Sequence, residues 1–194
     1  MATGSLGKPT ASAAGFGPSA LATPANAVTV ARLLATPALL AVLLHRPDSW
    51  VALGLWVVLA GSDGVDGWVA RRQGSTRSGA FLDPLADKFL VLGALVALVV
   101  KHRFWWLPVA LIATRELVIS GYRGYMGRRG VSVPARRWAK VKAVVQDVAV
   151  GFAVLPSTAH HRSVANTFLW IAVVLTLVTG AQYLLDGRQA ARAV

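Results

Sequence analysis

Four aspartates stand close together in the stretch SDGVDGWVARRQGSTRSGAFLDPLADK, residues 62–88. They are half of the eight acidic residues in the chain, and they form two pairs, Asp63 with Asp66 and Asp83 with Asp87. Spacings of three and four place the members of each pair on one face of an α-helix. If the two helices are antiparallel and joined by a short turn, all four carboxylates converge at one end of the helix pair.

Carboxylates gathered in so small a volume repel one another and take up protons unless cations hold them together. Ligation by oxygen alone suits a hard divalent ion, Mg²⁺ or Mn²⁺, and four carboxylates are enough to bridge two such ions. Two ions can clamp the attacking and leaving oxygens of an in-line displacement at phosphorus. The aspartate pattern therefore predicts phosphoryl or phosphatidyl transfer.

Small residues and an arginine accompany the aspartates. Gly67 and Gly79 leave space where a ligand or another backbone approaches closely, and Ala70 is also small. Arg71 can pair with a phosphate through its two-pronged guanidinium. Two other interpretations stay open on spacing alone: aspartates that only neutralise Arg71 or Arg115, and a proton- or cation-coupled transporter.

The rest of the sequence indicates a membrane protein. Of 194 residues, 55% are hydrophobic and 14% are charged, and apolar segments recur near residues 27–44, 50–70, 80–100, 104–126, 141–156 and 164–185. Each segment approaches the roughly 20 residues needed to cross the hydrocarbon core, so we expect an all-α fold with six transmembrane helices. The absence of cysteine excludes disulfides, zinc–thiolate sites and thiol nucleophiles.

Basic residues decide the expected orientation. The net charge is +12, but the cations lie between apolar runs, which favours lipid head groups and phosphate substrates over nucleic acid. More of them fall in the loops after the second and fourth segments than in the opposite loops, so the positive-inside rule places both termini and the active site in the cytoplasm, in a multi-pass protein of the plasma membrane. We expect a flexible tail at 1–25, a catalytic domain at 26–187 and a short cytoplasmic tail at 188–194.

The spacing Asp63-x2-Asp66-Gly67-x2-Ala70-Arg71-x7-Gly79-x3-Asp83-x3-Asp87 resembles the signature of the CDP-alcohol phosphatidyltransferase family. The resemblance implies a homodimer of six-helix subunits that transfers a phosphatidyl group from CDP-diacylglycerol and releases CMP. It also implies that the four aspartates hold two Mg²⁺ or Mn²⁺ ions and that Asp87 is the catalytic base. The residues implied to surround the CDP group are Asp63, Gly67, Ala70, Arg71 and Gly79.

Other residues bear on the acceptor alcohol. Arg115 and Arg123 are eight apart, or about 80° and 12 Å apart on a helix, and Lys140 stands at the entry to the fifth segment. We expect these three cations to bind the phosphate of an anionic acceptor. Lys142, Gln146 and Asp147 interrupt the apolar pattern of the fifth segment, so this helix is predicted to line a cavity.

Arg115-Glu116 followed by an apolar run, Ser120 and Arg123, together with Lys140-x-Lys142, is similar to the branch of the family that uses sn-glycerol 3-phosphate and gives phosphatidylglycerophosphate in phospholipid biosynthesis. Near the first segment, Asn26-x2-Thr29-x2-Arg32 is similar to the opening motif of that branch, although Pro24 stands one residue early. The alternatives are inositol phosphate as acceptor, or phosphatidylglycerol as acceptor to give cardiolipin.

Overall fold

The computed structural model describes residues 24–73, 79–129, 138–158 and 162–192, and their side chains within 26–62, 82–129, 140–158 and 162–189. The described residues form six α-helices and one short 3₁₀ turn at Pro156–Thr158, with no strand among them. The helices are α1 Pro24–His45, α2 Trp50–Gln73, α3 Gly79–Val100, α4 Trp106–Arg128, α5 Trp138–Val154 and α6 Arg162–Arg192.

The predicted all-α fold and its six helical segments are therefore confirmed. The main difference is α6, which was predicted to end near residue 185 but continues through Arg192. Residues 188–192, assigned to a tail from the sequence, continue this helix. The prediction ended too early because it followed the apolar residues, which mark the part of a helix that lies in an apolar environment. The helix continues beyond them as long as its backbone hydrogen bonds are formed.

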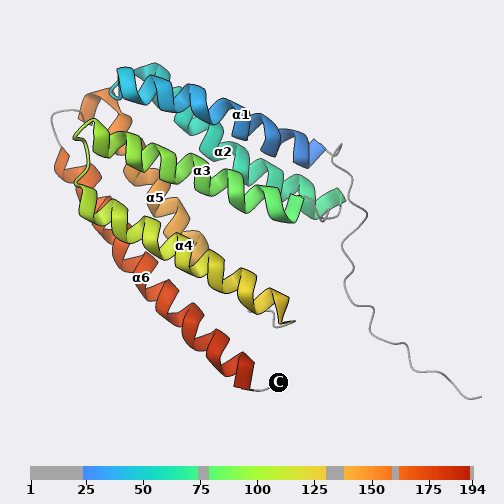
Figure 1. Cartoon of the computed structure of the whole chain (residues 1–194). Coiled ribbons are helices and arrows are strands. Elements are labelled where there is room, and N and C mark those ends of the chain that lie inside the picture. Colours follow the sequence, from blue (N-terminus) through green and yellow to red (C-terminus); the bar gives the residue numbers. More distant parts are fainter. Residues whose placement is uncertain (1–23, 74–78, 130–137, 159–161, 193–194) are drawn as a thin grey trace, which may run out of the picture.

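Helices α1, α2 and α3 lie side by side, and α4 and α6 run together on the other side of the molecule (Figure 1). Helix α5 packs chiefly on α6 and also contacts α2 and α3, so it joins the two groups. At residue level this joint includes Trp56 of α2, whose indole Nε1 donates to the carbonyl of Asp147 at 3.1 Å.

The buried face of α1 changes from polar to apolar along its length. Asn26, Thr29 and Arg32 are almost fully buried near its start, and Leu39 and Leu43 are fully buried near its end. These positions recur every three or four residues, so they form one stripe that faces the neighbouring helices. The bundle therefore has an apolar core at one end and buried polar groups at the other.

The apolar end is closed by contacts between loops. Arg103, after α3, forms an ion pair of 2.7 Å with Asp48, in the loop before α2. A backbone hydrogen bond to the Asp48 carboxylate and the nearby Arg103 together lower the pKa of Asp48. Arg162, at the start of α6, donates to the carbonyl of His102 at 3.2 Å. The buried polar residues near the start of α1 lie at the opposite end of the bundle, so we expect the active site there.

By length and composition, two of the described helices could cross a membrane, over Asn26–His45 and Arg162–Gln189, and Trp50–Ser62 is a shorter apolar helix. Many large apolar side chains also face outward, among them Leu34, Val58, Val96, Leu117 and Val174. An apolar exterior of this kind is typical of a membrane protein.

Candidate active site

Asp83 and Asp87 lie one turn apart near the start of α3, and both are half-buried. The hydroxyl of Thr29 on α1 donates to the Asp83 carboxylate. On the same helix, Arg32 donates from Nε to the hydroxyl of Ser62 on α2 at 3.0 Å. The polar stripe of α1 thus connects α2 and α3 at the level of the aspartates.

The other predicted metal-binding and CDP-binding residues lie where only the backbone is described. Asp63, Asp66, Gly67, Ala70 and Arg71 belong to the last turns of α2, and Gly79 begins α3. Their side chains lie outside the described residues, and so does the connection 74–78. Their roles in binding therefore stay predictions.

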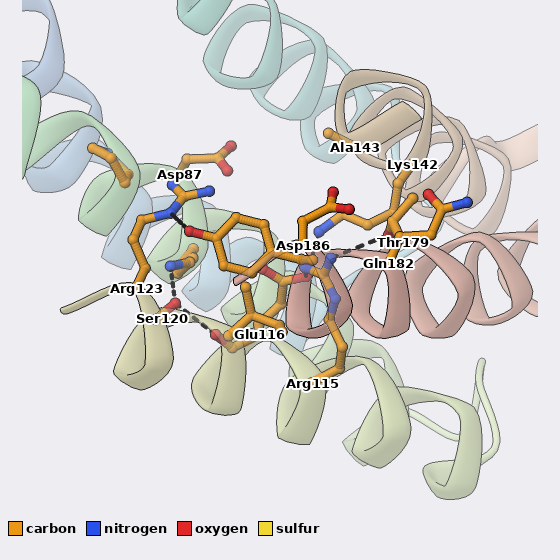
Figure 2. Close-up of a pocket in the computed structure, with 14 residues that line it drawn as sticks. Asp87, Arg115, Glu116, Ser120, Arg123, Lys142, Ala143, Thr179, Gln182 and Asp186 are labelled. Carbon is orange, nitrogen blue, oxygen red and sulfur yellow. Dashed lines mark hydrogen bonds and ion pairs between the residues drawn. The ribbon is translucent and has the colours of Figure 1, made fainter. Parts of the chain in front are cut away.

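A cavity of about 200 Å³ opens between α3, α4, α5 and α6 (Figure 2). We call it the α3–α6 cavity. Its charged lining residues are four cations and three carboxylates, namely Lys88, Arg115, Arg123, Lys142, Asp87, Glu116 and Asp186. It is smaller than the 300–1,000 Å³ typical of sites for drug-sized ligands, so it suits a small, charged molecule.

Arg115 is held by three contacts in the wall of the cavity. Its Nη1 donates to Glu116 at 2.8 Å, its Nε to the carbonyl of Thr176 at 3.0 Å and its Nη2 to the hydroxyl of Thr179 at 3.1 Å. These contacts use most of its donors and join α4 to α6. Arg115, which is predicted to bind phosphate, therefore also stabilises the packing of α4 against α6.

Arg123 is more available to a ligand. Its Nε lies 3.3 Å from the hydroxyl of Tyr183, and its guanidinium carbon lies 5.4 Å from the centre of that ring. Its terminal amino groups make no hydrogen bond or ion pair with the residues whose side chains are described. They can therefore form the bidentate contact that phosphate favours.

The two lysines of α5 face opposite directions. Lys140 is exposed and does not line the cavity, whereas Lys142 is buried, lines it and forms an ion pair with Glu116. The two residues are 200° apart on a helix, so only one of them can face the core. Lys140 makes no hydrogen bond or ion pair with the residues whose side chains are described, and its role stays a prediction. The prediction that α5 lines a cavity is confirmed by Lys142 and Ala143.

Several lining residues received no role from the sequence: Lys88, Glu116, Ser120, Thr179, Gln182, Tyr183 and Asp186. A signal existed for some of them. Glu116, the chain's single glutamate, shares one helix face with Ser120 and Arg123 at spacings of four and seven. Lys142, which the sequence already indicated as a polar break in the fifth segment, shares a buried stripe with Gln146, Ala149 and Val150. Of the lining residues on α6, Thr179, Gln182 and Tyr183 lie inside the predicted sixth segment and only Asp186 lies beyond its end, so the apolar pattern gave the helix but not which of its residues face a cavity.

The donor set fits a hard divalent ion as far as it is described. Asp83 and Asp87 offer oxygen ligands one turn apart, and the Thr29 hydroxyl orients the first of them. No group of three or more metal-binding side chains is found among the described residues, which exclude the side chains of Asp63 and Asp66.

Comparison with known proteins adds to this geometry. The sequence pattern of the CDP-alcohol phosphatidyltransferase family matches residues 22–178, which contain both aspartate pairs. The chain belongs to this family.

Curated relatives of this CDP-alcohol phosphatidyltransferase carry consistent names. A CDP-diacylglycerol–glycerol-3-phosphate 3-phosphatidyltransferase of Pseudomonas fluorescens is 38% identical over 170 residues, covering 82% of this chain and 87% of the relative. A probable phosphatidylglycerophosphate synthase of Mycobacterium tuberculosis is 37% identical over 165 residues, covering 82% and 78%. A relative from Salmonella choleraesuis, named like the first, is 36% identical over 169 residues, covering 83% and 92%.

Proposed function

We propose that this enzyme transfers the phosphatidyl group of CDP-diacylglycerol to sn-glycerol 3-phosphate and so forms phosphatidylglycerophosphate and CMP. The observation that carries the proposal is the α3–α6 cavity, which places Asp87 beside cationic side chains in a space of small-molecule size. Family membership supplies the phosphatidyl donor, and the names of the relatives support this acceptor.

The proposed reaction is a displacement at the β-phosphorus of CDP-diacylglycerol. Asp87 accepts the proton of the C1 hydroxyl of glycerol 3-phosphate, and this oxygen forms a new bond to the β-phosphorus. The bond between that phosphorus and the bridging oxygen breaks, and CMP leaves with the electron pair. A carboxylate in reach of the hydroxyl is the group that this proton transfer requires.

Asp63, Asp66, Asp83 and Asp87 would hold two divalent ions, Mg²⁺ or Mn²⁺. When bound, these ions neutralise the charge of the pyrophosphate and of the leaving group. Gly67, Ala70, Arg71 and Gly79 would surround the CDP group together with Asp63.

Arg123, Lys142 and Arg115 would bind the acceptor phosphate inside the α3–α6 cavity. Arg123 offers its terminal amino groups and Lys142 a buried ammonium. These donors suit a phosphomonoester, whereas an uncharged alcohol would gain little from them.

We further propose that all six helices span the plasma membrane, with residues 26–187 as the catalytic domain and with the cavity and both termini in the cytoplasm. The outward-facing apolar side chains and the distribution of basic loops support this placement. A homodimer surrounded by membrane lipids is proposed from family membership alone.

The test is an acceptor panel with purified protein, CDP-diacylglycerol and Mg²⁺ or Mn²⁺. Radiolabelled glycerol 3-phosphate should enter the lipid fraction, and inositol phosphate and phosphatidylglycerol should not compete with it. Preferred incorporation of inositol phosphate, or formation of cardiolipin, would replace the proposed acceptor. Substrate flux across sealed liposomes without CMP formation would indicate a transporter instead.

A further inference from the structure

A buried carboxylate, Glu116, lies in the wall of the cavity next to the cations proposed to bind the acceptor phosphate. The residue is 9% exposed, and its Oε1 accepts hydrogen bonds from Arg115 Nη1 at 2.8 Å and from Lys142 Nζ. The negative charge of Glu116 weakens the attraction of the cavity for an anionic ligand, so we ask what the carboxylate contributes in return.

Stability alone is a weak reason. A buried ion pair loses its hydration, and replacing both partners by uncharged groups of similar volume is often neutral or stabilising. By contrast, a lysine side chain is long and flexible and must be ordered before it can serve as a fixed binding group. Glu116 provides that order for Lys142.

The turn of α4 that carries Glu116 also holds a second lysine. The Ser120 hydroxyl donates to the backbone carbonyl of Glu116 at 2.6 Å, and the same hydroxyl is hydrogen-bonded to Lys88 of α3. Residues 116–120 thus contact Lys88, Arg115 and Lys142, and Arg115 is held by α6 as well. Arg123 is held separately by Tyr183 of α6.

We propose that Glu116 is a positioning residue that holds the Lys142 ammonium, and with it Arg115, in place to receive the phosphate of the acceptor. An ammonium has three N–H donors, and Glu116 is the only described residue that Lys142 contacts through a hydrogen bond. The other donors can therefore point into the cavity toward a phosphomonoester. This inference rests on the proposed function, because it assumes a phosphorylated acceptor.

The test uses three variants of the purified protein in lipid nanodiscs: Glu116→Gln, Glu116→Gln combined with Lys142→Met, and Asp48→Asn as a control. Asp48 pairs with Arg103 at the other end of the bundle, so the control removes an ion pair far from the cavity. Two readouts are needed: calorimetric binding of glycerol 3-phosphate alone, and the separate KM values for glycerol 3-phosphate and CDP-diacylglycerol.

Glu116→Gln should weaken glycerol 3-phosphate binding and raise its KM by about tenfold or more, because one partner of a buried charge pair is lost. The KM for CDP-diacylglycerol should stay unchanged. The double variant should bind glycerol 3-phosphate no better than Glu116→Gln, although its melting temperature should return toward that of the wild type. Asp48→Asn should change neither binding constant.

The inference would be overturned if the double variant bound glycerol 3-phosphate like the wild type, since the pair would then be structural. Equal effects of Glu116→Gln on both KM values would overturn it as well. If Glu116→Gln does not fold, the double variant, which removes the Lys142 ammonium together with the carboxylate and leaves Arg115 held by Thr176 and Thr179, decides between these outcomes. A wild-type protein that binds glycerol 3-phosphate but releases no CMP would contradict the proposed function, while the binding data would still decide the role of Glu116.

Discussion

Asp87 belongs both to the predicted metal site and to the α3–α6 cavity. It stands one turn after Asp83, which Thr29 orients, and it also lines the α3–α6 cavity beside Lys88. The spacing of the two aspartate pairs predicted that Asp87 lies with the other aspartates at one end of a helix pair. The sequence could not show that Arg115 is already bound by α6, because that depends on contacts between residues about 60 positions apart.

Replacing Asp87 by asparagine keeps the size of the side chain and removes its ability to accept a proton. We expect Asp87→Asn to lower kcat by about a hundredfold or more, which is the usual contribution of a general base. Size-exclusion elution and thermal melting of the purified variant should match the wild type. A variant that misfolds would indicate a structural role for Asp87, and one with normal kcat would exclude it as the base.

The two lysines of α5 give a matched comparison. Lys142→Met should raise the KM for glycerol 3-phosphate by about tenfold or more, because it removes a buried charge that faces the cavity. Lys140→Met should have a much smaller effect, because Lys140 is exposed and faces away from the lining residues. A larger effect of Lys140→Met than of Lys142→Met would support the phosphate-binding role that the sequence predicts for Lys140.

Helices α4 and α6 approach closely at two glycines of α6. A Cβ at Gly180 would lie 3.0 Å from Arg115 Nε, and a Cβ at Gly187 would lie 2.5 Å from the Tyr122 hydroxyl. The lack of a side chain at these positions lets Arg115 and Tyr122 pack between the helices. The sequence predicted both helices from their apolar segments. It could not predict this contact, because a glycine does not show which residue of another helix packs against it.

Gly187→Ala tests this contact. We expect it to destabilise the protein by about 1–3 kcal/mol, as overpacking commonly does, and to raise the KM for glycerol 3-phosphate because Tyr183 and Arg123 lie next to Tyr122. The control is Gly124→Ala on α4, where an added Cβ meets no atom within 4 Å. A melting temperature for Gly187→Ala equal to or above that of Gly124→Ala would show that the close approach has no energetic role.

The whole molecule has two chemically different ends. Loop contacts such as Asp48–Arg103 close one end, and the aspartates and the cavity occupy the other. The order of six helices and the concentration of basic residues at one end follow from the sequence. The arrangement of α5 and α6 around the cavity could not be predicted from the sequence, because an apolar pattern gives the length of a helix and not the helices that pack against it.

The proposed orientation can be tested by cysteine labelling, since the natural chain contains no cysteine. Arg46→Cys, in the loop before α2, should react with a membrane-impermeant maleimide in intact cells. Arg188→Cys, near the end of α6, should react only after the membrane is permeabilised. Both positions are exposed, so burial does not confound the result. Labelling of both positions in intact cells would contradict the placement of the C-terminus in the cytoplasm.

The most direct test of the central claim is the stoichiometry of the reaction. Purified wild-type protein, given CDP-diacylglycerol, labelled glycerol 3-phosphate and Mg²⁺ or Mn²⁺, should release one CMP for each labelled lipid formed, and chelation of the divalent ion should stop both. If CMP does not appear, or if it appears without incorporation of glycerol 3-phosphate into lipid, the proposed reaction is wrong.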